Sequence, residues 1–115
     1  MSRVVKERID DILKAIEKSK LYIDLVIGEQ NPNLIAMAED AVERNLQIVG
    51  EAVTRLPESL TSSYPQIPWA QIRGFRNILV HEYFGVDLDV VRDVVENHLP
   101  PLASVLRKHL SETNE

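Results

Sequence analysis

The chain has 115 residues, of which 44% are hydrophobic, 27% charged and 5% aromatic. We expect one domain, residues 1–115, with one core of moderate size, which excludes a multidomain enzyme. Thirteen Lys and Arg against eighteen Asp and Glu give a formal net charge of −5. Bulk attraction therefore does not draw the whole surface to nucleic acid or to an anionic membrane, and any nucleic-acid activity requires a local site.

Residue usage also limits the chemistry and the location. The chain contains no cysteine, which excludes a disulfide framework, a thiol nucleophile and a zinc site with cysteine ligands. The N-terminus is charged rather than apolar, and no apolar run approaches the roughly 20 residues that a bilayer span needs. We expect a cytoplasmic protein that does not contact a membrane.

The first half of the chain predicts two long helices. Apolar spacings of three, four and seven residues favour an amphipathic helix over 2–27, with Ser2 as N-cap, and a second helix that starts at Pro32 after an Asn31 cap and ends before Pro57. We expect the two to pair as an antiparallel hairpin. The predicted seam of the second helix is Leu34, Ala38, Ala41, Asn45, Val49, Ala52 and Leu56, with Ile35, Val42, Leu46 and Val53 widening the apolar face.

The second half begins with a loop over 58–68 that holds at most a short helical turn. A third helix is predicted over 69–84, and a further helix follows an Asp87 cap. Pro100 and Pro101 predict a kink or a brief break in that last segment. Because no strand-like alternation competes with these patterns, the fold class is all-α, a four- or five-helix up-and-down bundle.

Arg76 falls on the apolar seam of the predicted third helix. At 100° per residue it lies at about +40° from Ile72, with Leu79 at about −20° and Tyr83 at about +20°. Burying a guanidinium is costly unless it is paired, reaches a cleft or faces a polar cavity at a subunit boundary. One alternative is structural: the stem packs on the core while the head bridges to a carboxylate such as Glu43 or Glu51.

Charge and geometry set this segment apart. The segment between Glu58 and Glu82 contains no acidic residue, but it contains Arg73, Arg76 and His81. We call this segment the positive window, and its charge attracts phosphate. His81 can act as a general acid or base near neutral pH, but a regular helix places it about 140° from Arg76. Either the helix loosens before its end or the site combines two chains. The alternative is a surface histidine near a helix end.

Three other aromatic or imidazole side chains carry weaker signals. His98 and His109 have no third ligand nearby and are expected to face solvent. Trp69, the one tryptophan, is expected to anchor the start of the third helix in the core, with stacking on a base as the alternative. None of these residues predicts a metal site.

The run Arg76-Asn77-Ile78-Leu79-Val80-His81-Glu82-Tyr83 resembles the signature of HEPN-domain ribonucleases. The tyrosine two positions after the histidine is typical of HepT-like toxins, which are encoded beside a minimal nucleotidyltransferase antitoxin of the MntA type. Residues 46–52 and 84–87 are similar to the second-helix stretch of that family and to the segment that follows its motif.

The resemblance implies a homodimer whose two motifs form one RNA cleft and a metal-independent endoribonuclease that needs no cofactor. Arg76 would hold the scissile phosphate and stabilise its developing charge. His81 would act as general base on the ribose 2′-hydroxyl or as acid to the leaving oxygen. Asn77, and with it Arg73 in the positive window, would support substrate binding.

Tyr83 matches the position that the partner nucleotidyltransferase of this family modifies with AMP. A phosphodiester at that site would repel and block RNA in an arginine-lined cleft. The alternative is a core tyrosine, because Tyr83 shares the predicted seam with Ile72 and Leu79.

Three functions follow from these patterns. The first is an RNA-cleaving toxin neutralised by a nucleotidyltransferase antitoxin that AMPylates Tyr83. The second is a catalytically silent HEPN-like subunit that presents a substrate or a surface to a nucleotidyltransferase. The third is an interaction bundle in which Arg76 only bridges helices.

Overall fold

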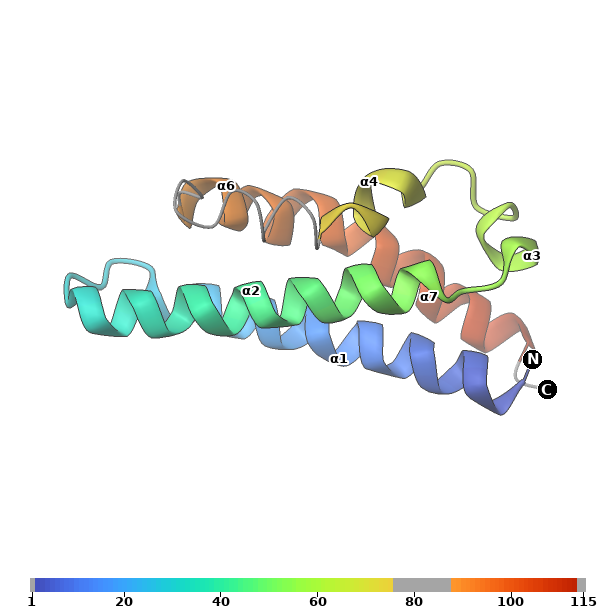
Figure 1. The fold of residues 1–115 in the computed structure, drawn as a ribbon, viewed down its shortest axis with the longest axis horizontal. Coiled ribbons are helices and arrows are strands. Elements are labelled where there is room, and N and C mark those ends of the chain that lie inside the picture. The colour runs from blue at the N-terminus through green and yellow to red at the C-terminus, as the bar shows by residue number, and fades with distance from the viewer. Residues whose placement is uncertain (1, 76–87, 114–115) are drawn as a thin grey trace.

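A computed structural model describes residues 2–75 and 88–113, and every described element is helical (Figure 1). The predicted all-α class is therefore confirmed. The elements in chain order are α1 (Arg3–Val26), α2 (Pro32–Thr54), α3 (Glu58–Thr61), α4 (Trp69–Arg73), α6 (Leu88–Asp93), a π-helical turn η1 (Val94–His98) and α7 (Leu99–Thr113).

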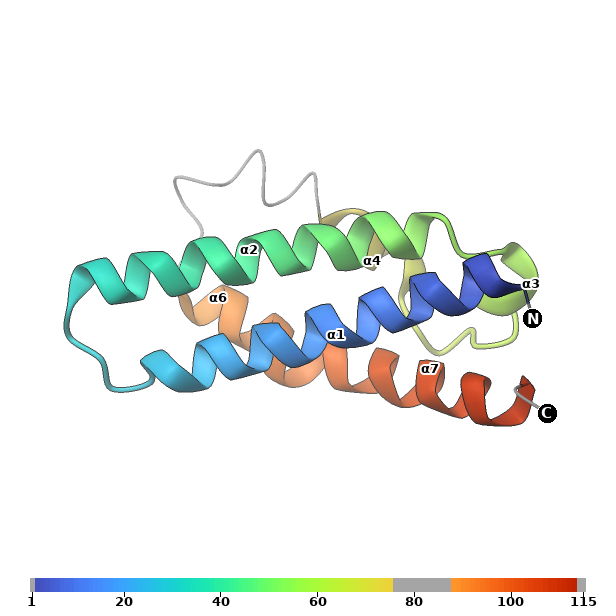
Figure 2. The ribbon, with the colours of Figure 1, turned by 90° about the horizontal axis from the view of Figure 1, so that it is seen from below.

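Helices α1 and α2 form the predicted antiparallel hairpin and lie side by side in both views (Figures 1 and 2). Ser2 caps α1, since its Oγ accepts a hydrogen bond from the Val5 amide at 3.2 Å. At the far end of α2, the Arg8 guanidinium donates to the carbonyl oxygen of Arg55 at 3.0 Å. The predicted stripe of α1 faces the core through Ile9, Ile12, Ile16 and Ile23.

The turn between the two long helices is built from local polar groups. Gly28 adopts a φ of 80°, a left-handed conformation that glycine reaches without a Cβ penalty. The Asn31 side chain accepts a hydrogen bond from the Asn33 amide at 2.9 Å, and Pro32 occupies the first helical turn. The predicted cap and helix start are confirmed.

The predicted seam of α2 is confirmed in part, because Ala38, Asn45, Val49 and Leu56 are buried. Among the residues expected to widen the apolar face, Val42, Leu46 and Val53 are buried as well, at 0–2% exposed. By contrast, Leu34 at the start of the predicted seam is 45% exposed. The apolar face is wider than one neighbouring helix can cover, so contact with α1, α4 and α6 selects the part that becomes core.

The middle of the chain forms short elements. As predicted, residues 58–68 contain one short helix, α3. The predicted third helix does not run unbroken from residue 69, because α4 ends at Arg73 and Gly74 forms its C-cap; glycine has a low helix propensity. The rest of that predicted helix, with Gly85 and the Asp87 cap, lies outside the described residues.

The irregularity predicted at the double proline lies one turn earlier. Pro100 and Pro101 are in the first turn of α7, where a missing amide is tolerated. Because neither proline has an amide hydrogen, the carbonyls four residues before them receive no helical hydrogen bond from them. The π-helical turn Val94–His98 directly precedes this part of the helix. The Leu99 amide donates to the Val94 carbonyl, five residues back. The helix path thus widens and continues instead of ending.

One hydrophobic cluster joins all these elements and holds α4 and α6 against α2. It is centred on aliphatic side chains of the long helices and α7, including Leu46, Leu99, Leu102 and Leu106. Among the described helices, none is long and apolar enough to span a bilayer.

Candidate functional site

Four of the five candidate site residues, namely Arg76, Asn77, His81 and Tyr83, lie outside the described residues. The elements on either side of them are α4 and α6, and both pack against α2 (Figure 2). The two described elements that flank the motif in the sequence are therefore held against one helix, α2.

Arg73 is the candidate that the structure describes. It is exposed in the last turn of α4 and lines an open pocket of about 460 Å³. The opposite side of this pocket comes from α3 and carries Glu58, with the hydroxyls of Thr61 and Ser62. One guanidinium is thus accompanied by one carboxylate, so this pocket alone does not form the positive window that the sequence predicts.

Trp69 is a core anchor, as predicted. It is 8% exposed, and its indole N–H donates to the carbonyl oxygen of Tyr64 at 2.9 Å. This bond fixes the start of α4 to the loop that precedes it. Because the ring belongs to the hydrophobic cluster, its faces are largely taken by packing, which disfavours the alternative of stacking on a base.

The two carboxylates considered as structural partners of Arg76 differ in their own contacts. Glu51 pairs with Arg55 at 3.1 Å on the exposed side of α2. Glu43 is half-buried and accepts a hydrogen bond from the Gln47 amide at 3.5 Å. Partial burial, together with the charge of Asp40, raises the pKa of the Glu43 carboxyl above its usual value of 4.5. Glu43 is therefore the acid that gains more from a cation nearby.

Replacement of Glu43 by glutamine is expected to raise the free energy of unfolding at pH 7 by about 0.5 kcal/mol. A raised pKa means that folding favours the neutral form of the Glu43 carboxyl. In the wild type this preference stabilises the fold below pH 4.5, and the stabilisation is lost as the pH rises through the raised pKa. Urea denaturation at neutral and acidic pH measures the difference. The gain disappears at about pH 3.5, where the wild-type carboxyl is already neutral.

Glu39→Gln is the matched control, since it removes an acid one turn earlier on the same helix. An equal gain in both variants would show that the cause is the general excess of acidic residues. The environment of Glu43 would then have no separate effect.

Two histidines, His98 and His109, lie in the described region. Among residues 2–75 and 88–113 there is no cluster of three metal-ligating side chains. His98 is exposed beside Asp93, as predicted. The prediction for His109 is wrong: it is half-buried, its Nδ1 lies 3.1 Å from the Tyr64 hydroxyl, and the two rings pack edge to face. The contact joins segments 45 residues apart, so no local pattern signals it.

Comparison with known proteins places these features in a family. A family model described as "Ribonuclease HepT-like" matches residues 12–109. The "Probable ribonuclease HepT" of Thermococcus cleftensis is 32% identical over 108 residues, which cover 94% of this chain and 97% of that protein. No solved structure matches the chain at a significant level.

Two proteins of Methanocaldococcus jannaschii are also similar. "Gamma-glutamylcyclotransferase and putative RNase MJ0434" is 33% identical over 121 residues, covering all of this chain. "Putative RNase MJ0127" is 42% identical over 62 residues, or 54% of this chain. The matched part is 51% of the length of each of these proteins.

The described helices form an all-α bundle, and the sequence between α4 and α6 contains an Arg-x4-His motif, as in the HEPN-domain ribonucleases that the sequence resembles. The family match, which runs from within α1 to within α7 and includes α2 and the motif, makes the assignment specific. The chain belongs to the HepT-like ribonuclease family.

Proposed function

We propose that this protein is a metal-independent endoribonuclease and the toxin of a toxin-antitoxin pair. The observation that carries the proposal is the family match over residues 12–109, which contains the whole Arg76–Tyr83 motif. The substrate is RNA, because a ribose 2′-hydroxyl provides the internal nucleophile that makes cleavage without a metal or cofactor possible.

Arg76 and His81 carry the reaction. The Arg76 guanidinium binds the scissile phosphate through two parallel hydrogen bonds and stabilises the charge that develops on it. His81 takes the proton of the 2′-hydroxyl as that oxygen bonds to phosphorus, or gives a proton to the oxygen that leaves as its bond to phosphorus breaks. Asn77 orients the phosphate or His81, and Arg73 adds positive charge where the strand enters.

The active form is a homodimer in which the two motifs share one cleft. On a regular helix Arg76 and His81 point about 140° apart, so two chains supply what one helix face does not. Residues 59–81 contain no acid, and a two-fold axis brings two such segments together. RNA binding should then be local and should weaken as the salt concentration rises, despite the net charge of −5.

The direct assay is cleavage of a labelled single-stranded RNA by the purified chain in the presence of EDTA. Cleavage that persists with the chelator, and that depends on Arg76 and His81, supports the proposal. Absence of cleavage, together with a stable complex with a nucleotidyltransferase, would instead support the non-catalytic HEPN-like subunit.

Tyr83 is the proposed control point. A minimal nucleotidyltransferase antitoxin of the MntA type transfers AMP from a nucleoside triphosphate: the Tyr83 oxygen bonds to the α-phosphorus and pyrophosphate leaves. The added phosphodiester is negative and the nucleoside is bulky, so RNA is repelled and blocked at the arginine-lined cleft.

Co-expression with a minimal nucleotidyltransferase of the MntA type is expected to add mass in whole AMP units to the chain and to abolish its RNA cleavage. Intact mass spectrometry measures the addition. Tyr83→Phe removes the acceptor oxygen while keeping the ring, so it should stay unmodified and active, whereas Tyr64→Phe should be modified like wild type. Mass added equally to the Tyr83→Phe variant would refute this assignment.

A further inference from the structure

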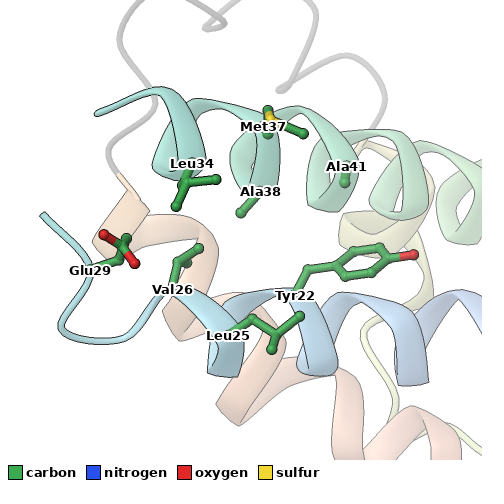
Figure 3. A pocket seen from close by; sticks show the side chains of 8 residues that line it. All are labelled: Tyr22, Leu25, Val26, Glu29, Leu34, Met37, Ala38 and Ala41. Atoms are coloured by element: carbon green, nitrogen blue, oxygen red, sulfur yellow. The ribbon is translucent and has the colours of Figure 1, made fainter. Parts of the chain in front are cut away.

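The hairpin end of the molecule carries an apolar groove that is separate from the motif. It has a volume of about 320 Å³ and lies between α1 and α2 near their connecting turn (Figure 3). Its large apolar side chains are strongly exposed: Leu25 is 67%, Met37 68% and Leu34 45% accessible. Contiguous exposure of this kind marks an interaction surface more often than a free surface.

The groove exists because α2 has a wider apolar face than the core uses. Val42, Leu46 and Val49 belong to the core and are almost fully buried. The apolar residues on the flank of that stripe, Leu34, Met37 and Ala41, line the groove. Tyr22, Leu25 and Val26 line it from α1. The two helices thus contribute matched apolar strips to one surface.

The two ends of this surface carry charges of opposite sign. Glu29 lines the groove at the turn. At the other end, Lys18 precedes Tyr22 by one turn on the same strip of α1, and Arg44 follows Ala41 by about one turn on the strip of α2. All three are exposed.

Some exposed bases of the described region pair with an acid and others do not. Arg55, Arg92 and Arg107 each pair with a glutamate. Lys18 and Arg44 form no ion pair with any described residue. Their positive end of the groove is therefore available to an acidic group from another molecule.

We propose that the occupant of this groove is a second copy of the same chain, bound antiparallel about a two-fold axis through the centre of the groove. A two-fold interface requires a surface that is complementary to itself. An acidic end and a basic end on either side of an apolar centre satisfy this requirement. In the pair, Glu29 of each copy faces Lys18 and Arg44 of the other, and the two apolar centres cover each other.

The size of the surface determines the strength of this contact. Lys18 lies eight residues before the end of α1 at Val26, about 12 Å along the helix, and the turn with Glu29 lies beyond that end. Two helices side by side are about 20 Å wide. The contact then buries on the order of 400 Å² per copy, about half of what a standard stable interface buries. The association is therefore weak and depends on concentration, and it is independent of any dimer formed through the motif.

Sedimentation velocity from about 10 μM to 1 mM tests the proposal on the full chain. The expected result is a concentration-dependent doubling of whatever species the wild type forms when dilute. Glu29→Lys should weaken that step about tenfold or more, and so should the pair Lys18→Glu with Arg44→Glu. A variant that combines Glu29→Lys, Lys18→Glu and Arg44→Glu reverses the sign of the charge at both ends of the groove. Its association should return to within about threefold of wild type.

Two matched controls separate this surface from general effects. Glu58→Lys reverses an exposed acid at the opposite end of the molecule and should leave the doubling unchanged. Leu25→Asp should abolish the doubling, whereas Val4→Asp, at a 51% exposed position near the N-terminus, should not. Both residues are exposed, so circular dichroism should show an unchanged fold for each.

Covalent capture provides an independent readout, because the chain has no cysteine of its own. Met37→Cys lies in the groove and should form an intermolecular disulfide under mild oxidation, whereas Val4→Cys should not. Several outcomes would overturn the proposal: a mass that does not respond to Leu25→Asp, a triple variant no better than Glu29→Lys, or a groove that binds phospholipid vesicles or an amphipathic Leu/Lys peptide and no second copy.

Discussion

Replacing Arg76 or His81 with alanine is expected to lower the rate of RNA cleavage by about three orders of magnitude. Without Arg76, the charge on the phosphate lacks its bidentate donor; without His81, no side chain of the motif exchanges protons with the reacting oxygens. Single-turnover cleavage of a labelled RNA with enzyme in excess measures the chemical step. Substrate binding, measured separately, should weaken for Arg76→Ala and change little for His81→Ala.

Arg107→Ala and His98→Ala are the matched controls for these two substitutions. Each removes the same residue type from an exposed position in the C-terminal part of the chain, so cleavage should stay within about twofold of wild type. Arg73→Ala should lie between the two groups, since Arg73 is proposed to assist binding only. Wild-type rates in both motif variants would refute the proposed chemistry.

Mixing the two inactive variants tests whether one site draws on two chains. If Arg76 of one chain works with His81 of its partner, a mixed dimer contains one intact site and one site that lacks both groups. Because half of the dimers are mixed at equal amounts, about a quarter of wild-type activity should return. No recovery after exchange of subunits would place both groups in the same chain.

Leu46→Ala is expected to lower the free energy of unfolding by about 3 kcal/mol, which corresponds to a fall of roughly 10 °C in melting temperature. Leu46 is 2% exposed on the side of α2 that faces the core. Truncation removes buried apolar surface and leaves a cavity that neighbouring residues fill only in part. Urea denaturation followed by circular dichroism measures the loss.

Leu34→Ala is the control with the same chemistry on the same helix. Leu34 is 45% exposed in the groove, so the same truncation should cost less than about 1 kcal/mol. Equal losses in the two variants would mean that Leu34 is buried like Leu46, which would contradict its exposed position in the groove.

Local chemistry in the sequence was sufficient for much of the fold. The Ser2 and Asn31 caps, the start of α2 at Pro32 and the short helix in 58–68 each depend on groups a few residues apart, and all are confirmed. The all-α class followed from periodicity, which needs no knowledge of neighbours. The candidate residues Arg76, Asn77, His81 and Tyr83 came from one contiguous motif, and their roles remain proposals.

Contacts between distant segments decided what the pattern left open. The apolar face of α2 is wide, and only packing against α1, α4 and α6 decided that Val42 and Leu46 belong to the core whereas Leu34 is exposed. The same choice created the exposed groove. The helix irregularity that was predicted at the prolines lies in the π-helical turn before them. The contact between His109 and Tyr64 likewise appears only in the tertiary structure.

The sequence by itself determined the helices, their caps and the family of this protein, because these depend on spacing within single segments. Which apolar residues are core and which remain a surface was decided only when the helices met, since burial is a property of a pair of faces and not of one. Charge also has one property that the sequence determines, the net charge of −5, and one that only the tertiary structure determines, the pattern on the surface. The net charge describes the whole chain, whereas the groove ends at Glu29 and at Lys18 with Arg44 become a complementary pattern only once α1 and α2 lie side by side.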